Sequence, residues 1–314
     1  MDGCKTNENK MNGYEMNENE WKGYEKINFR NAEELSGLCR SHGLPVSEIM
    51  LRRECGLTEV SRKDVLARMG RAWEIMKESA RSPIHTPKKS MGGLIGGEAQ
   101  LLTRHRDEGK SICGSVISRS ITYAMAVLEV NTSMGLIVAA PTAGSSGVVP
   151  GVLLALQEEH SISDEKIIQV LFNAGAIGYL AMRNATVAGA VGGCQAEVGV
   201  ASAMAASAAV ELMGGIPSQC LSAASTVLMN MLGLVCDPIG GLVESPCQGR
   251  NAAGAANALI AAELSLSGVR QPIPFDEMLE AMYTVGKRLP MELRETARGG
   301  CAATPPASSL CGGC

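Results

Sequence analysis

The second part of the chain constrains the fold most strongly, because it is built almost wholly from small and aliphatic residues. From Ser111 onward, runs of Ala, Met and Leu alternate with short loops rich in Gly and Pro. Alternating runs of β-branched residues, which are typical of strands, are nearly absent, and residues 136–140 form the one candidate for a short strand. We therefore predict an all-α protein. The expected apolar helices cover residues 113–133, 148–158, 163–183, 197–213, 218–232, 250–267 and 275–288.

The chain also has few aromatic side chains from which to build a core. Phe, Tyr and Trp make up 3% of its 314 residues, whereas Gly alone occurs 36 times. The core therefore has to consist of Ala, Leu, Val, Ile, Met and Gly. Because small residues let backbones approach closely, we expect the helices to pack tightly.

The first part of the chain has a different character. Residues 1–28 are rich in Asn, Glu and Lys, a composition typical of a disordered tail. Charged, helical sequence follows from Asn31 to Ala80, and Ser61 with Asp64 three residues later predicts a helix start within it. Pro and Gly in residues 81–98 predict a loop.

We therefore divide the chain into a tail of residues 1–28, one helical domain of residues 29–306 and a Cys-rich tail of residues 307–314. The formal charge of −4 argues against a nucleic acid partner, since phosphate binding needs clustered Lys and Arg. Two stretches without charged residues, 130–157 and 212–236, are interrupted by Pro, Ser, Asn and Gly, so neither predicts a membrane span. No apolar signal segment opens the sequence. We predict a cytoplasmic protein that does not bind membranes.

Three of the 11 cysteines lie in polar, Gly-rich loops of the apolar part. They are Cys194 in GAVGGCQAEVG, Cys236 in GLVCDPIGGLVE and Cys247 in ESPCQGRNAAG. Cytoplasmic cysteines are free thiols or metal ligands more often than disulfides. No histidine follows His160, so three thiolates without an imidazole favour an iron–sulfur cluster over zinc. On a four-iron cluster, three ligands would leave one iron open as a Lewis acid. The alternative is three buried structural cysteines.

Two polar groups of residues offer anion-binding chemistry. Thr142, Ser145 and Ser146 lie in the loop PTAGSSGVVPG just before a predicted helix, and hydroxyl and N–H groups at a helix start can bind a substrate carboxylate. Arg250 and Asn251 open another predicted helix, where the guanidinium can bind a carboxylate through two hydrogen bonds. The alternatives are an ordinary capping loop and a surface arginine.

Other motifs limit the choice of cofactor. Between Lys110 and Lys287 the sequence holds one lysine, Lys166, at the charged start of a predicted helix. A pyridoxal phosphate enzyme needs a lysine for its Schiff base, so we predict that this cofactor is not used. The Gly-rich segment SMGGLIGGE, at 90–98, lacks the GKS or GKT of a phosphate-binding loop. The segment RETARGG, at 294–300, is most simply an exposed, salt-bridged helix end.

Longer motifs carry a family resemblance. They are AAPTAGSSGVVPGVL, GGCQAEVGVASAMAASA, LGLVCDPIGGLVESPCQGRNAAGAANA and LRETARGG. Together they resemble the α chain of the bacterial iron–sulfur L-serine dehydratases, over about Phe29 to Pro306. The resemblance implies an all-helical catalytic domain and an oxygen-sensitive 4Fe–4S cluster held by Cys194, Cys236 and Cys247. It also implies conversion of L-serine to pyruvate and ammonia by an oligomer in which this α chain works with a separate β chain.

The chain departs from the resemblance at its two ends. The Asn- and Glu-rich tail is an addition, and the C-terminal segment carries Cys301, Cys311 and Cys314. One hypothesis is that a thiolate of this segment reaches the open iron and blocks it. Truncation after Pro306 is then expected to raise activity.

The resemblance allows roles to be given to individual residues. The substrate-binding candidates are Thr142, Ser145, Ser146, Arg250 and Asn251. The catalytic candidates are Ser145, Ser146 and His85. The base that removes the Cα proton is left open between these residues, His105 and the β chain. Glu197 and Asp237 are further options for the base, although hydrogen bonds that support the cluster ligands suit both better.

Three alternative functions follow from the same residues. A cluster-dependent hydro-lyase could act on another small hydroxy acid or on L-threonine, because a pocket discriminates against one added methyl group by only ~1–3 kcal/mol. An electron-transfer or iron-sensing protein is a second alternative, which three ligands in place of four disfavour. A structural helical subunit with merely buried cysteines is the third.

Overall fold

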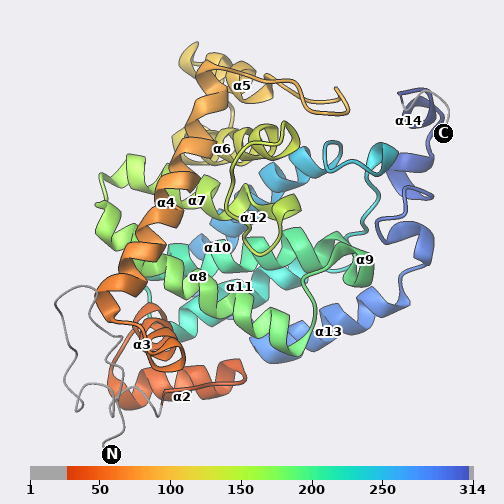
Figure 1. The fold of residues 1–314 in the computed structure, drawn as a ribbon. Coiled ribbons are helices and arrows are strands. Elements are labelled where there is room, and N and C mark those ends of the chain that lie inside the picture. Colours follow the sequence, from red (N-terminus) through yellow and green to blue (C-terminus); the bar gives the residue numbers. More distant parts are fainter. Residues whose placement is uncertain (1–26, 311–314) are drawn as a thin grey trace, which may run out of the picture.

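The structure is a computed structural model that describes residues 27–310 (Figure 1). The rest of the predicted tails, residues 1–26 and 311–314, lies outside the described residues, and the division of the chain at residues 28 and 306 stays a prediction. The helices are α2 (Ala32–His42), α3 (Val46–Thr58), α4 (Arg62–His85), α5 (Glu98–Asp107), α6 (Gly114–Thr132), α7 (Val148–His160), α8 (Asp164–Asn184), α9 (Gly189–Gly192), α10 (Val200–Leu212), α11 (Pro217–Asn230), α12 (Cys247–Leu266), α13 (Phe275–Arg288) and α14 (Pro305–Leu310). Short 3-10 turns cover Ala143–Ser145, Ile239–Gly241, Met291–Leu293 and Gly300–Ala303, and a π turn covers Gln195–Gly199.

The all-α prediction is confirmed, since residues 27–310 contain no strand beyond one isolated bridge between Cys236 and Arg294. Each expected apolar helix is present, with ends that differ by a few residues. Within the described part of the chain, no helix combines the length and the apolar character that crossing a lipid bilayer requires.

Helix α10 forms the centre of the core. It packs against α7, α8, α11 and α12, and every residue from Val200 to Val210 is buried. Ala and Ser make up most of that helix, so its neighbours can approach it from all sides. A similar close approach joins α6 and α7, where a Cβ added at Gly151 would lie 2.8 Å from the carbonyl oxygen of Ser120. The expectation of tight packing through small residues therefore holds.

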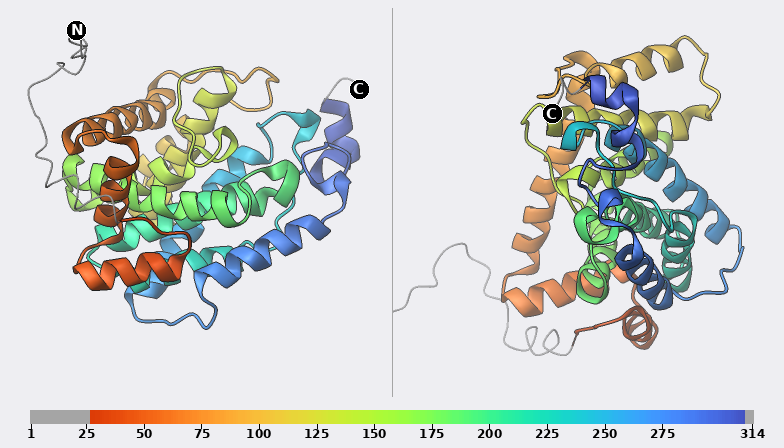
Figure 2. Two further views of the ribbon diagram at one scale, coloured as in Figure 1. Left: turned by 60° about the horizontal axis from the view of Figure 1, so that its bottom comes forward. Right: turned by 90° about the vertical axis from the view of Figure 1, so that its right-hand side faces the viewer.

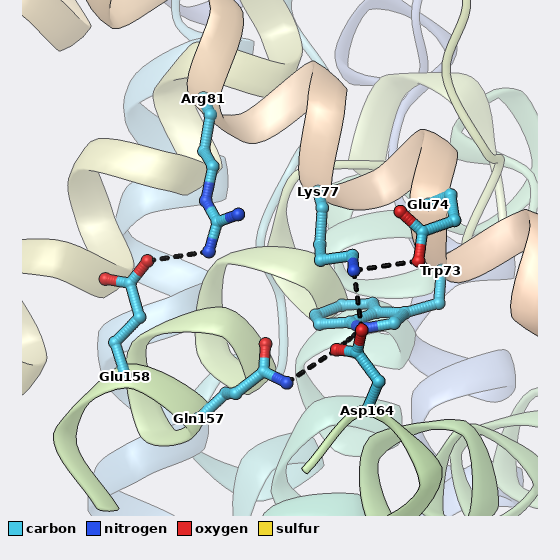
Figure 3. Close-up of polar contacts among 7 residues, drawn as sticks. All are labelled: Trp73, Glu74, Lys77, Arg81, Gln157, Glu158 and Asp164. Carbon is cyan, nitrogen blue, oxygen red and sulfur yellow. Dashed lines mark hydrogen bonds and ion pairs between the residues drawn. The ribbon is translucent and has the colours of Figure 1, made fainter. Parts of the chain in front are cut away.

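Helix α4 runs along one side of the molecule, from α3 to α5 and α6 (Figure 1). A cluster of hydrogen-bonded polar side chains connects α4 to Asp164, the first residue of α8 (Figure 3). The indole N–H of Trp73 donates to Asp164 Oδ1 at 2.8 Å, and Lys77 Nζ donates to Oδ2 at 2.8 Å. Gln157 of α7 donates to Oδ1 at 2.7 Å. These donors, Lys77 first, lower the pKa of Asp164 to about 2.

Two local predictions are wrong. The loop expected at residues 81–98 begins only after His85, because α4 continues through Pro83. This proline lies buried in the last helical turn, where it removes one backbone hydrogen bond, and the Thr86 N–H donates to the carbonyl of Ser82 to close the helix. Residues 136–140 form no strand, because no segment of residues 27–310 pairs with them. The N-cap at Ser61 is confirmed, since its side chain accepts the Asp64 N–H.

Candidate active site

Three loops bring the predicted cysteine ligands to one region. Cys194 directly precedes the π turn that leads into α10, Cys236 lies between α11 and α12, and Cys247 is the first residue of α12. All three are free thiols with exposed fractions of 2%, 3% and 8%. Burial raises the pKa of Cys194 to about 11 and that of Cys247 to about 12. Burial also raises the pKa of Cys236, and the charges of Cys194 and Cys247 raise it further, so the thiols lie within electrostatic reach of one another.

Two carboxylates, those of Glu197 and Glu295, lie beside the thiol of Cys236. Ligand atoms of Glu197, Cys236 and Glu295 all lie within 4.8 Å of one another. Burial raises the pKa of Glu197 to about 7, the charge of Glu295 adds to this effect, and a hydrogen bond from Thr142 opposes it. The structure therefore combines thiol, carboxylate and hydroxyl groups at one point.

Glu295 is the site residue that the sequence interpretation missed. In segment 294–300 Glu295 and Arg298 are exposed as expected, but the segment is not a helix end, because it folds back on the loop of Cys236. The Cys236 N–H donates to the Leu293 carbonyl at 2.9 Å, and the Glu295 N–H donates to the Cys236 carbonyl at 2.7 Å. The right-hand view of Figure 2 shows this C-terminal segment crossing in front of the loop. In the sequence, the Gly299–Gly300 pair was the available sign that this segment approaches another part of the chain closely. In the structure, a Cβ at Gly300 would lie 2.1 Å from Asp237 Oδ2.

The hydroxyl-rich loop adjoins the carboxylates. Thr142 Oγ1 lies 3.0 Å from Ser145 Oγ, and Thr142 also hydrogen-bonds Glu197. Ser145 and Ser146 are completely buried, and the Ser146 hydroxyl donates to the Ala143 carbonyl at 2.7 Å. Of the three hydroxyls in the loop, that of Thr142 contacts the carboxylate of Glu197, whereas that of Ser145 lies between Thr142 and the Ala140 carbonyl, to which it donates at 3.5 Å.

Asn251 joins this loop to the cysteine at the start of α12. Its side-chain amide donates to the carbonyls of Gly144 at 2.8 Å and Cys247 at 2.9 Å, and its oxygen accepts the Gly147 N–H at 3.1 Å. Since both donor hydrogens and the acceptor are used within the protein, Asn251 is suited to hold the site together.

Arg250 is held by protein groups as well. It donates to the Val235 carbonyl at 2.9 Å and pairs with Asp237 at 2.6 Å, an ion pair that does not have hydrogen-bond geometry. Its charge lowers the pKa of Cys194 and Cys247 against the larger effect of burial. Asp237 Oδ2 also accepts the Cys301 N–H at 2.6 Å. Arg250 thus stabilises the anionic form of the thiols.

The two imidazoles proposed as bases are exposed. His85 is the exposed last residue of α4, and His105 is exposed in α5. The catalytic role of His85 stays a prediction.

Glycines let the backbone approach the Cys236 thiol and the Glu197 carboxylate closely. A Cβ added at Gly189 would lie 3.1 Å from Cys236 Sγ and 2.8 Å from Glu197 Oε2, and one at Gly144 would lie 3.6 Å from Glu197 Oε1. Any larger residue at Gly189 would collide with Glu197 and Cys236. An all-α domain that gathers thiols, carboxylates and hydroxyls in this way has the features of a catalytic domain for a small polar molecule.

The chain belongs to the serine dehydratase alpha chain family, whose family model matches residues 41–302. It is 45% identical over 282 residues to the probable L-serine dehydratase alpha chain of Bacillus subtilis (strain 168), covering 90% of this chain and 94% of that relative. The L-serine dehydratase alpha chain of Peptoniphilus asaccharolyticus is 41% identical over 273 residues, with coverages of 87% and 94%. The family resemblance inferred from the motifs is thereby confirmed.

One relative is a longer protein, of which this chain matches only a part. L-serine dehydratase TdcG of Escherichia coli (strain K12) is 36% identical over 281 residues, which cover 88% of this chain but only 62% of that protein. The longer relative therefore joins to its matching region a further segment that this chain does not match.

Proposed function

We propose that the chain is the α chain of a two-chain L-serine dehydratase, a lyase that converts L-serine to pyruvate and ammonia. The observation that carries the proposal is the buried Cys236 thiol beside the carboxylates of Glu197 and Glu295, with the buried thiols of Cys194 and Cys247 within electrostatic reach of it. The hydroxyl of Thr142 hydrogen-bonds Glu197 in the same site. The two most similar relatives described above are alpha chains of about the same extent. The unmatched part of the longer relative supports a separate β chain as the partner.

Cys194, Cys236 and Cys247 would hold a 4Fe–4S cluster. The donor set fits that group, because three thiols without disulfides or imidazoles suit iron–sulfur chemistry, and at Gly189 no side chain stands against the Cys236 thiol. When bound, the cluster supplies a Lewis acid for the departing hydroxyl group of the substrate. Because the thiol pKa values are raised, cluster binding has to release protons from these residues.

The remaining groups bind and orient the substrate. Thr142 and Ser145 supply hydroxyl donors for the substrate carboxylate, while the carboxylates of Glu197 and Glu295 are acceptors that suit its α-ammonium group. Asn251 and Ser146, whose hydrogen bonds are satisfied internally, keep the hydroxyl loop in register with α12. Fixing the substrate at both ends orients its Cα–H bond for proton removal.

The test is anaerobic reconstitution of the chain with iron and sulfide. We expect absorbance at about 400 nm, typical of a protein-bound cluster, and pyruvate formation when L-serine and the β chain are added. The Cys236→Ala variant should lose both properties, whereas Cys55→Ala, which removes a buried thiol of the separate cluster of core residues around Phe172, should keep both. A colourless wild-type chain would contradict the proposal.

The same assay tests the alternatives and the partner. A small hydroxy acid or L-threonine that reacted faster than L-serine would replace the proposed substrate. A coloured but inactive chain that becomes active when a β chain is added would establish the two-chain arrangement. Full activity of the isolated chain would contradict that arrangement.

A further inference from the structure

The Gly-rich segment 90–97, to which the sequence interpretation assigned no function, is bound by the loop that leads to Cys247. The Gly92 N–H donates to Glu244 Oε1 at 2.6 Å, and the Leu94 N–H donates to Glu244 Oε2 at 2.9 Å. Glu244 is 2% exposed and lies three residues before Cys247. Both oxygens of one buried carboxylate therefore connect two segments that lie far apart in sequence.

Two other carboxylates bind the far end of the same segment. Glu129, which is 1% exposed, accepts the N–H groups of Gly97 at 3.0 Å and Ala99 at 2.9 Å. Glu98 Oε2 accepts the Gly96 N–H at 2.7 Å. Carboxylates of the protein thus occupy backbone donors that a phosphate-binding loop would offer to its ligand, so the segment serves to connect parts of the fold.

The fit between the two segments depends on the absence of a side chain at position 92. A Cβ at Gly92 would lie 2.3 Å from Leu242 Cδ1 and 2.8 Å from Glu244 Oε1. Among the ion pairs of the described residues, none involves Glu244. The two backbone N–H groups are therefore what compensates for burying this carboxylate.

The connection continues into the first turn of α12. The Glu244 carbonyl accepts the Gln248 N–H at 2.9 Å, and the Gln248 amide donates to the Met125 carbonyl at 3.3 Å. Cys247 lies between Glu244 and Gln248 in the sequence, so the direction of its thiol depends on where Glu244 is held.

We propose that Glu244 is a positioning residue for Cys247, which it directs toward Cys194 and Cys236 by binding segment 90–97. That the direction of the Cys247 thiol matters for cluster binding rests on the proposed function. The positioning of this thiol by Glu244 does not, because it is a property of the metal-free chain. Loss of the two hydrogen bonds would free the loop between α11 and α12 and expose the Cys247 thiol through local opening.

The test measures how fast iodoacetamide alkylates each cysteine of the folded, metal-free chain, resolved by peptide mass spectrometry. Glu244→Ala should raise the alkylation rate of Cys247 about tenfold, since hydrogen bonds to a buried charged group are lost. Glu244→Gln keeps one acceptor and should show a smaller rise of about threefold. The rate at Cys39, a buried thiol on α2, serves as the internal reference and should not change.

Glu129→Gln is the matched control, because Glu129 is likewise a buried carboxylate that accepts two backbone N–H groups, those of Gly97 and Ala99, and neither of them belongs to the loop of Cys247. It should leave the Cys247 rate unchanged even where it lowers the melting temperature as much as Glu244→Gln does. If Glu244→Ala does not fold, Gly92→Ala answers the same question by displacing the carboxylate. An unchanged Cys247 rate in a folded Glu244 variant, or equal increases at Cys247 and Cys39, would overturn the proposal.

Iron content after anaerobic reconstitution separates this inference from the proposed function. If the wild type binds iron, the Glu244 variants should bind less of it, in parallel with their Cys247 alkylation rates. If the wild type binds none while the Glu244 variants still expose Cys247, the proposed function fails and the positioning role stands.

Discussion

At the scale of single residues, the site is held together by side chains whose polar atoms are fully used. Asn251 is the clearest case, because its three hydrogen bonds join the hydroxyl loop to Cys247. The sequence indicated that Asn251 belongs to the site but suggested contact with substrate. Only the fold shows that the carbonyls of Gly144 and Cys247 take up both amide hydrogens.

Replacement of Asn251 by Asp should therefore destabilise the chain. The carboxylate cannot donate to the two carbonyls and would face them as an additional acceptor, so we expect the free energy of unfolding to fall by about 3 kcal/mol. Urea denaturation of the metal-free chain measures this loss. Asn31→Asp, at the N-cap of α2 where either side chain accepts the Glu34 N–H, is the control and should change stability by less than about 0.5 kcal/mol. Equal effects at the two positions would contradict the assigned role.

At the scale of helices, the runs of Ala, Met and Leu between Gly and Pro were sufficient to predict the apolar elements. The sequence could not predict the end of α4, because Pro83 is accommodated by burial in the last turn. It also could not show that Glu295 meets Cys236, since the two residues are brought together by a bridge between distant segments. Periodicity reports the local environment of a residue, whereas such bridges depend on the packing of the whole chain.

The close approach of α6 and α7 gives a prediction at this scale. In Gly151→Ala the new methyl group would lie 2.8 Å from the Ser120 carbonyl oxygen and 3.0 Å from the Ala124 nitrogen. We expect a loss of about 2 kcal/mol in stability, because neither backbone can yield without separating the helices. Gly175→Ala in α8, where nothing lies within 4 Å, should instead gain about 0.5–1 kcal/mol from helix propensity. Thermal unfolding of both variants tests this contrast in sign.

At the scale of the whole molecule, α4 is attached to the end of α7 and the start of α8 by the polar cluster of Figure 3. Sequence patterns predicted these helices but not the cluster, since Trp73 and Asp164 are separated by 91 residues. A buried indole N–H needs an acceptor, but its identity is decided by the arrangement of the helices.

This cluster predicts a pH dependence of stability. The pKa of Asp164 lies at about 2 in the folded chain and at about 3.9 in an unfolded one. The unfolded state therefore binds more protons in this interval, so stability is complete above about pH 4 and falls as the pH is lowered toward about 2. Urea denaturation at several pH values should show a weaker decline for Asp164→Asn than for the wild type. Equal declines would show that other carboxylates cause the acid sensitivity.

The bridge at Cys236 also has a consequence for the order in which the site is completed during synthesis. Cys194 and Cys236 leave the ribosome before Leu293 and Glu295, which supply the backbone partners of Cys236. Synthesis proceeds from the N-terminus, so a nascent chain that has released both cysteines still lacks the segment that fixes one of them. Assembly of the site is therefore among the last steps in the formation of this domain.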